Sequence, residues 1–180
     1  MLSVDRDADA AVEARIHIGW NKFRQLVPLL INRAISVIRR GRLYSSCVQS
    51  SMLHGSETCP VRKENEMALQ RAEMRMVRWM CNVKVKDRVP SKVLRERLGR
   101  YDIILILQQN RLRWYGHVLR LEEDTDWVKK CIEYKVEGSR TRGSPKRTWI
   151  EVVQKDCQAR NLNGEYAMDR GRWKKLIKIG

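Results

Sequence analysis

Apolar residues recur at steps of three and four along most of the chain, which is the period of an amphipathic helix. The first run predicts one helix with six apolar positions: Val12, Ile16, Trp20, Phe23, Val27 and Leu30. Pro28 lies near the end of this run, where we expect it to kink or stop the helix. The next run predicts a helix over about 35–53, and its inward positions are Tyr44, Cys47, Val48, Ser51 and Met52.

The pattern is clearest over about 63–81. At roughly 100° per residue, one face of this predicted helix collects Leu69, Ala72, Met76, Trp79 and Met80. The opposite face collects Arg71, Arg75 and Arg78. A cationic stripe of this kind suits a helix lying on a phosphate backbone, although a solvated surface is its commoner meaning. Glu73 projects into the apolar arc and needs a partner if it is buried.

Two further helices are predicted after a basic connector. Ser91 can cap a short helix over 92–98 and Gly99 can end it. Asp102 then caps a long helix that runs to about 121, with Ile104, Leu107, Trp114, Val118 and Leu121 as its core stripe. Another face of this helix carries Arg113, His117 and Arg120. Arg111 lies within the apolar arc, so we hypothesise that it pairs with Glu73 or another acid.

The last third of the chain is predicted to hold short helices and a basic loop. The segment 138–147 contains no acid, and its bases are Arg140, Arg142, Lys146 and Arg147. Such a segment cannot form a core. A short helix is expected at 127–134, and Thr148 and Glu151 form a capping box that opens another helix, with Ile150, Val153 and Cys157 inward. After a turn at 161–164, the last helix is expected to pack Trp173, Leu176 and Ile177 inward.

No segment predicts a persuasive strand, so the expected fold class is all-α. We expect an irregular, thumb-like helical bundle over 1–121 and a basic C-terminal helical segment over 122–180.

Charge narrows the range of partners. The chain carries 37 Lys and Arg against 21 Asp and Glu, a net charge of +16, of which +9 falls within 61–121. A positive field of this size favours a polyanion, because each neutralised phosphate releases counterions. A merely basic solvated surface ranks second and an anionic membrane surface a distant third. No apolar run approaches the roughly 20 residues that a membrane helix needs.

The composition gives no sign of an enzyme, a metal site or a cofactor site. The five cysteines are widely spaced without a CxxC pair, which argues against a disulfide framework and a zinc finger. No phosphate-binding glycine loop is present. Asp5, Asp7 and Asp9 lie in an N-terminal segment that we expect to be frayed. They interrupt the apolar stretch that a signal peptide requires. We therefore expect a nuclear or cytoplasmic protein and no secretion. The three histidines are isolated from any nucleophile motif.

Nucleic-acid binding therefore has three candidate groups of residues. They are the stripe Arg71, Arg75 and Arg78; the patch Arg113, His117 and Arg120; and the loop bases Arg140, Arg142, Lys146 and Arg147. Trp20, Trp79, Trp114 and Trp173 occur at core spacing, so we assign them mainly to packing. The pattern favours contacts to the sugar–phosphate backbone over reading of bases.

An ordered series of short motifs also resembles a known family. The series comprises Gly41–Tyr44 (GRLY), Leu53–Thr58 (LHGSET), Glu73–Cys81 (EMRMVRWMC), Asp87–Val89 (DRV), Leu94–Gly99 (LRERLG), Asn110–Arg120 (NRLRWYGHVLR), Val136–Gly138 (VEG) and Thr148–Trp149 (TW). It is similar to the region that follows the catalytic palm in reverse transcriptases of non-LTR retrotransposons, of the RTE-like kind. The likeness covers nearly the whole chain, and its most specific part is RLRWYGH.

The resemblance implies that roughly the first 120 residues correspond to the helical thumb, which grips the template–primer duplex while the palm does the chemistry. It implies an RNA–DNA or DNA duplex as partner, and a separate palm and fingers polypeptide as a possible second one. The family's paired catalytic aspartates and endonuclease domain have no counterpart here, so polymerase activity is implied for the parent protein and not for this chain.

The sequence departs from the family pattern at His54, where tyrosine is usual, at Cys59, where tryptophan is usual, and at Ser144 in the basic loop. Three readings follow in order of preference: a non-catalytic nucleic-acid-binding fragment, a helical protein-interaction module or decayed fragment, and an enzyme in its own right.

Overall fold

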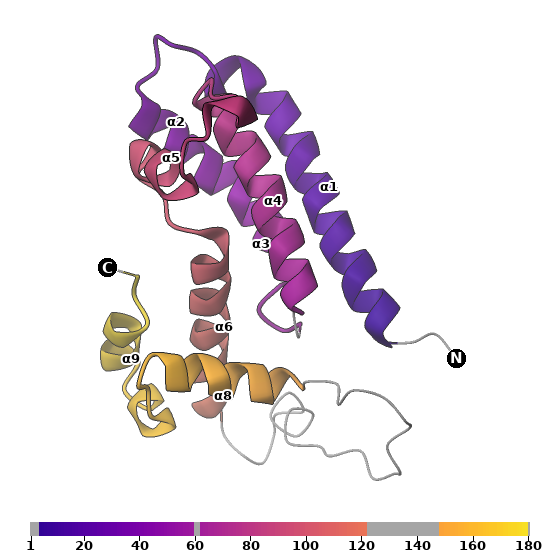
Figure 1. Cartoon of the computed structure of the whole chain (residues 1–180). Coiled ribbons are helices and arrows are strands. Elements are labelled where there is room, and N and C mark those ends of the chain that lie inside the picture. Colours follow the sequence, from indigo (N-terminus) through magenta and orange to yellow (C-terminus); the bar gives the residue numbers. More distant parts are fainter. Residues whose placement is uncertain (1–3, 60–61, 122–147, 180) are drawn as a thin grey trace. The chain divides into compact units, whose positions relative to one another are not determined.

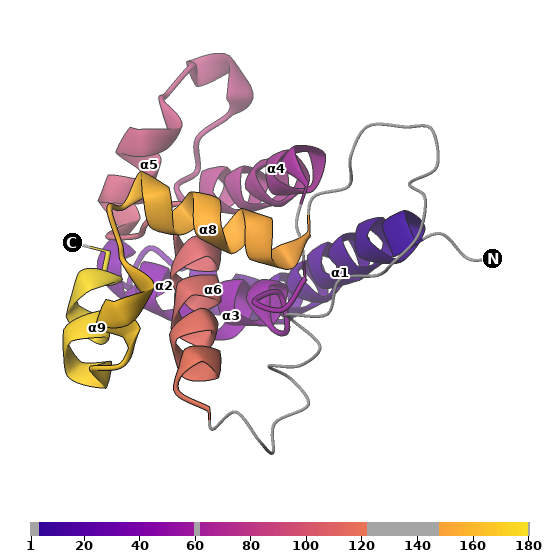
Figure 2. The same cartoon turned by 90° about the horizontal axis from the view of Figure 1, so that it is seen from below.

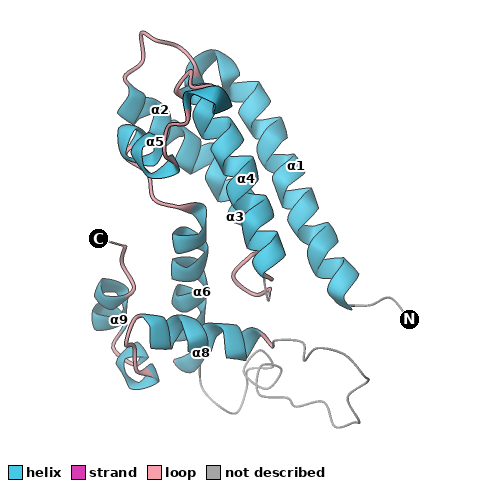
Figure 3. Ribbon diagram, in the orientation of Figure 1, coloured by secondary structure: helices cyan, strands magenta, loops and turns pink. Residues whose placement is uncertain are grey.

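The computed structural model describes residues 4–59, 62–121 and 148–179, and the side chains of residues 4–8 are left out of the description. The described residues form helices joined by turns and loops, without a strand among them (Figure 3). The predicted all-α class is confirmed. The chain divides into two compact units, the first within 1–56 and 61–107 and the second within 57–60 and 108–180.

Helix α1 (Val4–Leu30) is the longest helix of the first unit, and Figure 1 shows it alongside α4 (Lys63–Met80), which it contacts. Val12, Phe23 and Leu30 of its apolar stripe are buried, as the period predicts. Pro28 lies inside the last turn and the helix ends two residues later. This position is tolerated because only the final turn is affected by the missing amide hydrogen.

The helix predicted over 35–53 is a continuous helical run with an unexpected widening in its middle. It consists of α2 (Val37–Leu43), the π-helical η1 (Tyr44–Gln49) and α3 (Ser50–Leu53). Serine hydroxyls in this run donate to preceding carbonyls: Ser46 to Arg42, Ser50 to Ser46, and Ser51 to Val48. These bonds stabilise a register in which backbone hydrogen bonds are rearranged. Tyr44, Val48 and Met52 are buried as predicted, while Cys47 and Ser51 are half-buried.

Helix α4 ends in a motif that reverses the chain direction. Val83 donates its amide hydrogen to the carbonyl of Arg78, Asn82 donates to that of Trp79, and Asn82 has a φ of 53°. This is the pattern of a Schellman cap with asparagine at the left-handed position. Leu69, Ala72, Met76 and Met80 are buried as predicted, but Trp79 is 49% exposed. The buried face of α4 is thus turned relative to the predicted one: it also takes in Glu73, Met74 and Val77, and it leaves Trp79 at its edge.

A short 3-10 turn, η2 (Val85–Asp87), leads to α5 (Ser91–Leu98). Ser91 is the first helical residue and not the cap; Pro90 precedes the helix, and no side chain caps it. This corrects the prediction, since proline before the first turn already fixes an extended entry. Gly99 ends the helix with a φ of 61°, as expected. At Gly41, a Cβ atom would collide with the carbonyl of Leu98, so α2 and α5 pack with backbone almost touching backbone.

The first unit has one core and one buried polar network. The core joins side chains from α1, the 37–53 run, α4, α5 and the start of α6 (Ile103–Leu119). Buried Glu73 accepts a hydrogen bond from Gln49 at 2.9 Å and forms an ion pair with Arg95 at 3.2 Å. Arg95 also pairs with Asp102 at 2.9 Å. The hypothesis that Glu73 pairs with Arg111 is therefore wrong.

The second unit packs the remainder of α6 against α8 (Trp149–Ala159), η3 (Gly164–Ala167) and α9 (Arg170–Leu176), which Figure 2 shows from a second direction. Its buried core residues are Leu112, Val153, Cys157, Ala167, Trp173 and Ile177. Arg111 is buried and pairs with Asp156 at 2.7 Å, which confirms that it needs an acid. Leu176, expected in the core, is 42% exposed.

The motif residues of α6 explain how this unit closes. The indole of Trp173 occupies the space that a Cβ atom of residue 116 would need, so the glycine at position 116 makes room for the indole. The indole nitrogen of Trp173 donates to the carbonyl of Leu112 at 3.0 Å. The capping box of Thr148 and Glu151 at the start of α8 is confirmed. Trp149 donates its indole hydrogen to the carbonyl of Glu57 at 2.7 Å.

The two compact units divide within α6, between Leu107 and Gln108, whereas the predicted domains divide at 121. The reason is that Arg111, Leu112 and Gly116 pack with α8 and α9. The short helix expected at 127–134 and the basic loop over 138–147 lie outside the described residues. Among the helices that are described, none combines the length and the apolarity needed to cross a bilayer.

Candidate nucleic-acid interface

The arginine stripe of α4 lies on one side of the helix. Arg71 and Arg75 are exposed and Arg78 is half-buried, while Leu69, Met76 and Met80 on the other side belong to the core. Arg71 donates from Nε to the carbonyl of Met67 at 3.1 Å, a contact within its own helix. At a rise of about 1.5 Å per residue, the three Cα atoms span roughly 10 Å along the axis. The predicted gathering of these arginines on one face is confirmed.

The stripe is not neutralised by neighbouring acids. Among the described residues, Arg95 forms ion pairs with Glu73 and Asp102, and Arg111 forms one with Asp156. None of them uses a stripe arginine. The acids Glu73, Asp102 and Asp156 are thus paired with Arg95 and Arg111. The guanidinium groups of the stripe keep their charge for solvent or a ligand.

The acids of these pairs respond to burial in different ways. Burial raises the pKa of Glu73 to about 7, although Arg95 beside it acts in the opposite direction. Burial also raises the pKa of Asp156, and Arg111 partly offsets the rise. Each acid serves the packing of its own unit, and Glu73 lies on the buried side of α4, away from the stripe.

The patch predicted on α6 belongs to the second unit and is more tightly held. Arg113 and His117 are exposed, and the ring of His117 lies 5.4 Å from that of Trp114. Arg113 donates to the side-chain carbonyl of Asn110 at 3.2 Å. Arg120 is half-buried and its guanidinium donates to the carbonyl of Ala167, at the end of η3. Arg113 and His117 are free to reach a ligand, whereas Arg120 also has a structural role.

The third predicted group consists of Arg140, Arg142, Lys146 and Arg147. All four lie outside the described residues, so their part in an interface stays a prediction.

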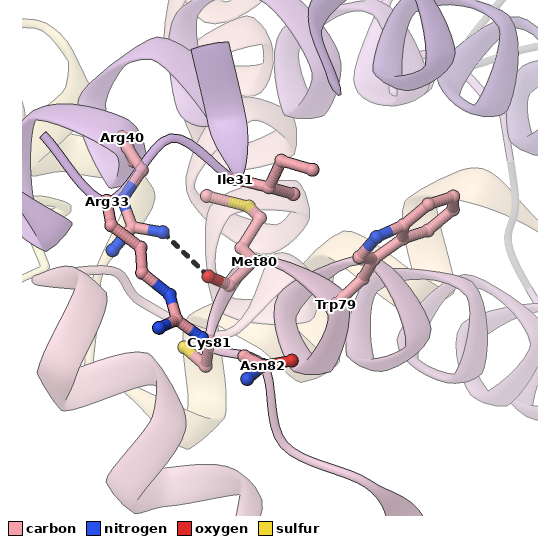
Figure 4. Close-up of a pocket in the computed structure, with 7 residues that line it drawn as sticks. All are labelled: Ile31, Arg33, Arg40, Trp79, Met80, Cys81 and Asn82. Carbon is pink, nitrogen blue, oxygen red and sulfur yellow. Dashed lines mark hydrogen bonds between the residues drawn. The ribbon is translucent and has the colours of Figure 1, made fainter. Parts of the chain in front are cut away.

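The sequence did not predict a pocket in the first unit, at the ends of α1 and α4. It has a volume of about 410 Å³ and its lining residues are Ile31, Arg33, Arg40, Trp79, Met80, Cys81 and Asn82. Figure 4 shows Arg33 and Arg40 on one side, beside Met80 and Cys81, and Trp79 on the other. The residues come from three places in the chain, so no local pattern reveals them. The one available signal was the position of Trp79 at the edge of the apolar arc, about 40° from Arg75.

Among the described residues, no three histidine, cysteine or acidic side chains converge on one point. Cys47, Cys81 and Cys157 are free thiols, and burial raises the pKa of Cys81 and brings that of Cys157 to about 11. A thiol with a raised pKa is a poor nucleophile near neutral pH.

Comparison with protein-family models, with curated proteins and with solved structures finds no match to this chain.

Proposed function

We propose that the chain is a non-catalytic nucleic-acid-binding module, which holds the sugar–phosphate backbone of an RNA–DNA or DNA duplex on arginine-bearing helix faces. The observation that carries the proposal is the set of Arg71, Arg75 and Arg78 on one side of α4, without an acid partner among the described residues. The net charge of +16 supports it. The resemblance to the thumb of non-LTR retrotransposon reverse transcriptases suggests the same role in a longer protein.

Backbone contacts should make binding steeply dependent on salt and nearly independent of sequence. Each neutralised phosphate contributes about 0.9 to the slope of log affinity against log salt for duplex DNA. The experiment measures the affinity of the full chain for a 20-base-pair DNA duplex and for the matching RNA–DNA hybrid, by fluorescence anisotropy at several salt concentrations. Replacing Arg71, Arg75 and Arg78 by glutamine should reduce the slope by about two to three.

A matched control removes the same charge elsewhere on the unit. Lys22, Arg24 and Lys92 are exposed and lie on α1 and α5. Their replacement by glutamine lowers the net charge equally, and it should leave most of the slope in place. Equal losses in the two triple variants would show that only total charge matters, and affinity insensitive to salt would overturn the proposal.

The alternative is a helical protein-interaction module, with a separate palm and fingers polypeptide as one candidate partner. Exposed apolar side chains favour it, most clearly Val85, which is 75% exposed, and Met168, which is 65% exposed. Gel filtration tests this: self-association that is lost when Val85 is replaced by serine would favour the alternative. In either case we propose no polymerase activity, and primer extension by the isolated chain would contradict that.

A further inference from the structure

The pocket beside Trp79 lies where two helices end together. Leu30 is the last residue of α1 and Met80 the last of α4, and the loop over 31–36 passes beside both ends. Helix C-termini carry partial negative charge and unpaired carbonyls, so the site would by itself repel an anion. The side chains that line it change this.

Arg40 neutralises both helix ends. Its Nη1 donates to the carbonyl of Met80 at 2.8 Å, as Figure 4 shows, and to that of Leu30 at 3.3 Å. Arg40 is only 7% exposed, and its Nε has no hydrogen-bond partner within the described structure. A buried donor left without an acceptor is costly. The Nε atom is itself closed to solvent, so the part that Arg40 plays at the pocket is to hold the two helix ends together.

Arg33 and Asn82 make the rim of the pocket polar and cationic. Arg33 is exposed in the loop over 31–36, which is held by a turn in which Asn32 accepts a hydrogen bond from the amide of Ala34. Asn82 occupies the left-handed position of the cap that ends α4. With the helix ends already neutralised by Arg40, the charge of Arg33 is the net charge offered to a ligand.

Trp79 provides an aromatic wall. Its ring is packed against Phe23, with ring centroids 5.4 Å apart and planes tilted by 53°. The side chain is nevertheless 49% exposed, which leaves ring surface for a ligand. Exposed aromatic side chains beside cationic groups are the usual platform on which unpaired bases stack. Trp79 also directly follows Arg78, so a strand along the arginine stripe reaches the pocket without leaving α4.

We propose that this pocket binds one unpaired nucleotide, with the base stacked on Trp79 and the phosphate on Arg33. If the nucleotide is part of a bound strand, this inference rests on the proposed function. A free mononucleotide has the same base and phosphate groups, and its binding would not depend on the proposed function. The pocket volume is within the range of small-molecule sites, roughly 300–1,000 Å³.

The test compares a blunt hairpin duplex with the same hairpin carrying one unpaired nucleotide, and with one carrying an abasic overhang. Stacking of one base on an aromatic side chain is worth roughly five- to hundredfold in affinity. We expect the full chain to bind the single overhang about tenfold more tightly than the blunt or abasic hairpins. Replacing Trp79 by alanine should remove this preference, and replacing it by phenylalanine should keep most of it. Arg33→Gln should weaken binding of the overhang and leave that of the blunt hairpin unchanged.

Arg75→Gln is the matched control, because Arg75 lies on the stripe and outside the pocket: it should weaken all three hairpins by the same factor. Equal affinity for blunt and overhanging hairpins, or a preference that survives Trp79→Ala, overturns the inference while leaving the proposed function intact. In a separate titration with adenosine 5′-monophosphate, NMR follows the signal of the indole N–H group of Trp79. A shift there without duplex binding supports the pocket and overturns the proposed function, and no shift together with no overhang preference overturns the pocket.

Discussion

Arg111 and Asp156 form a buried ion pair at 2.7 Å, although 45 residues separate them in the chain. Arg111 comes from α6 and Asp156 from α8, so the pair fastens together two helices of the second unit. Within the described residues, the Nε and Nη2 atoms of Arg111 are buried without hydrogen-bond partners, so Asp156 is the one acid there that the arginine pairs with.

Removing one member of this pair should cost much more than replacing both. Asp156→Ala leaves a buried guanidinium without a counterion, and we expect the free energy of unfolding to fall by about 3–5 kcal/mol. The double replacement of Arg111 and Asp156 by methionine should recover most of that loss. Urea unfolding of the four proteins of this cycle measures the coupling. A second cycle between Arg111 and Glu73 is the control, and it should give additive effects.

The buried Glu73 carboxyl predicts a pH dependence of stability. Its pKa is raised from 4.5 to about 7 by burial, so the folded chain binds a proton more tightly than the unfolded chain. Stability is therefore highest below about pH 4.5 as far as this group is concerned, and it declines as pH rises to about 7. The full change corresponds to about 3 kcal/mol.

Glu73→Gln isolates this contribution. The amide keeps the shape of the side chain, and Arg95 retains Asp102 as a partner. We expect the variant to be more stable than the original chain at pH 8, and the advantage to shrink at pH 5. Chemical unfolding at the two pH values gives the comparison, and a stability difference between the two chains that is the same at pH 8 and pH 5 would contradict the raised pKa.

Gly41 should not tolerate any side chain. A Cβ atom there would collide with the backbone carbonyl of Leu98, which cannot move without shifting α5 away from α2. We expect Gly41→Ala to lower the free energy of unfolding by about 2 kcal/mol or more. Gly164→Ala is the matched control, because a Cβ atom at that position meets its nearest neighbours at 3.7 Å. Thermal unfolding should separate the two variants clearly.

Gly116 should show the same sensitivity in the second unit through a different neighbour. A methyl group there would displace the indole of Trp173, and with it the hydrogen bond to Leu112. We expect Gly116→Ala to cost about 1–3 kcal/mol and to change the near-ultraviolet circular dichroism of the tryptophans. Trp173→Phe, which removes the hydrogen bond and leaves more room, should be the milder change. An unaltered spectrum in Gly116→Ala would show that the indole does not lie on the glycine.

The helical period predicts which segments are helices, because it records only which side of each segment is apolar. The period also places Arg71, Arg75 and Arg78 on one face correctly, because the relative positions of three residues within one helix follow from its geometry alone. The π-helical stretch over Tyr44–Gln49 escaped prediction because spacings of three and four hide a local change of register. The true partner of Arg111 depends on tertiary packing, which the pattern of one helix does not contain.

The pocket shows the same limit more sharply. Arg33, Arg40 and Trp79 come together only because α1 and α4 end at one place and Arg40 bridges their terminal carbonyls. The spacing of Trp79 fits a core position, and only the direction of the buried face of α4 decides that about half of the indole stays exposed.

The contact between Gly41 and the Leu98 carbonyl also bears on which substitutions the sequence can accept. A phosphate-binding face can exchange one cation for another, or move a charge by a turn, and still attract the same polyanion. The crossing of α2 and α5 offers no such freedom, because every residue except glycine brings an atom into space that the carbonyl already fills. Variants of this sequence that still fold should therefore exchange the exposed arginines of the proposed interface, such as Arg71 and Arg75, sooner than Gly41.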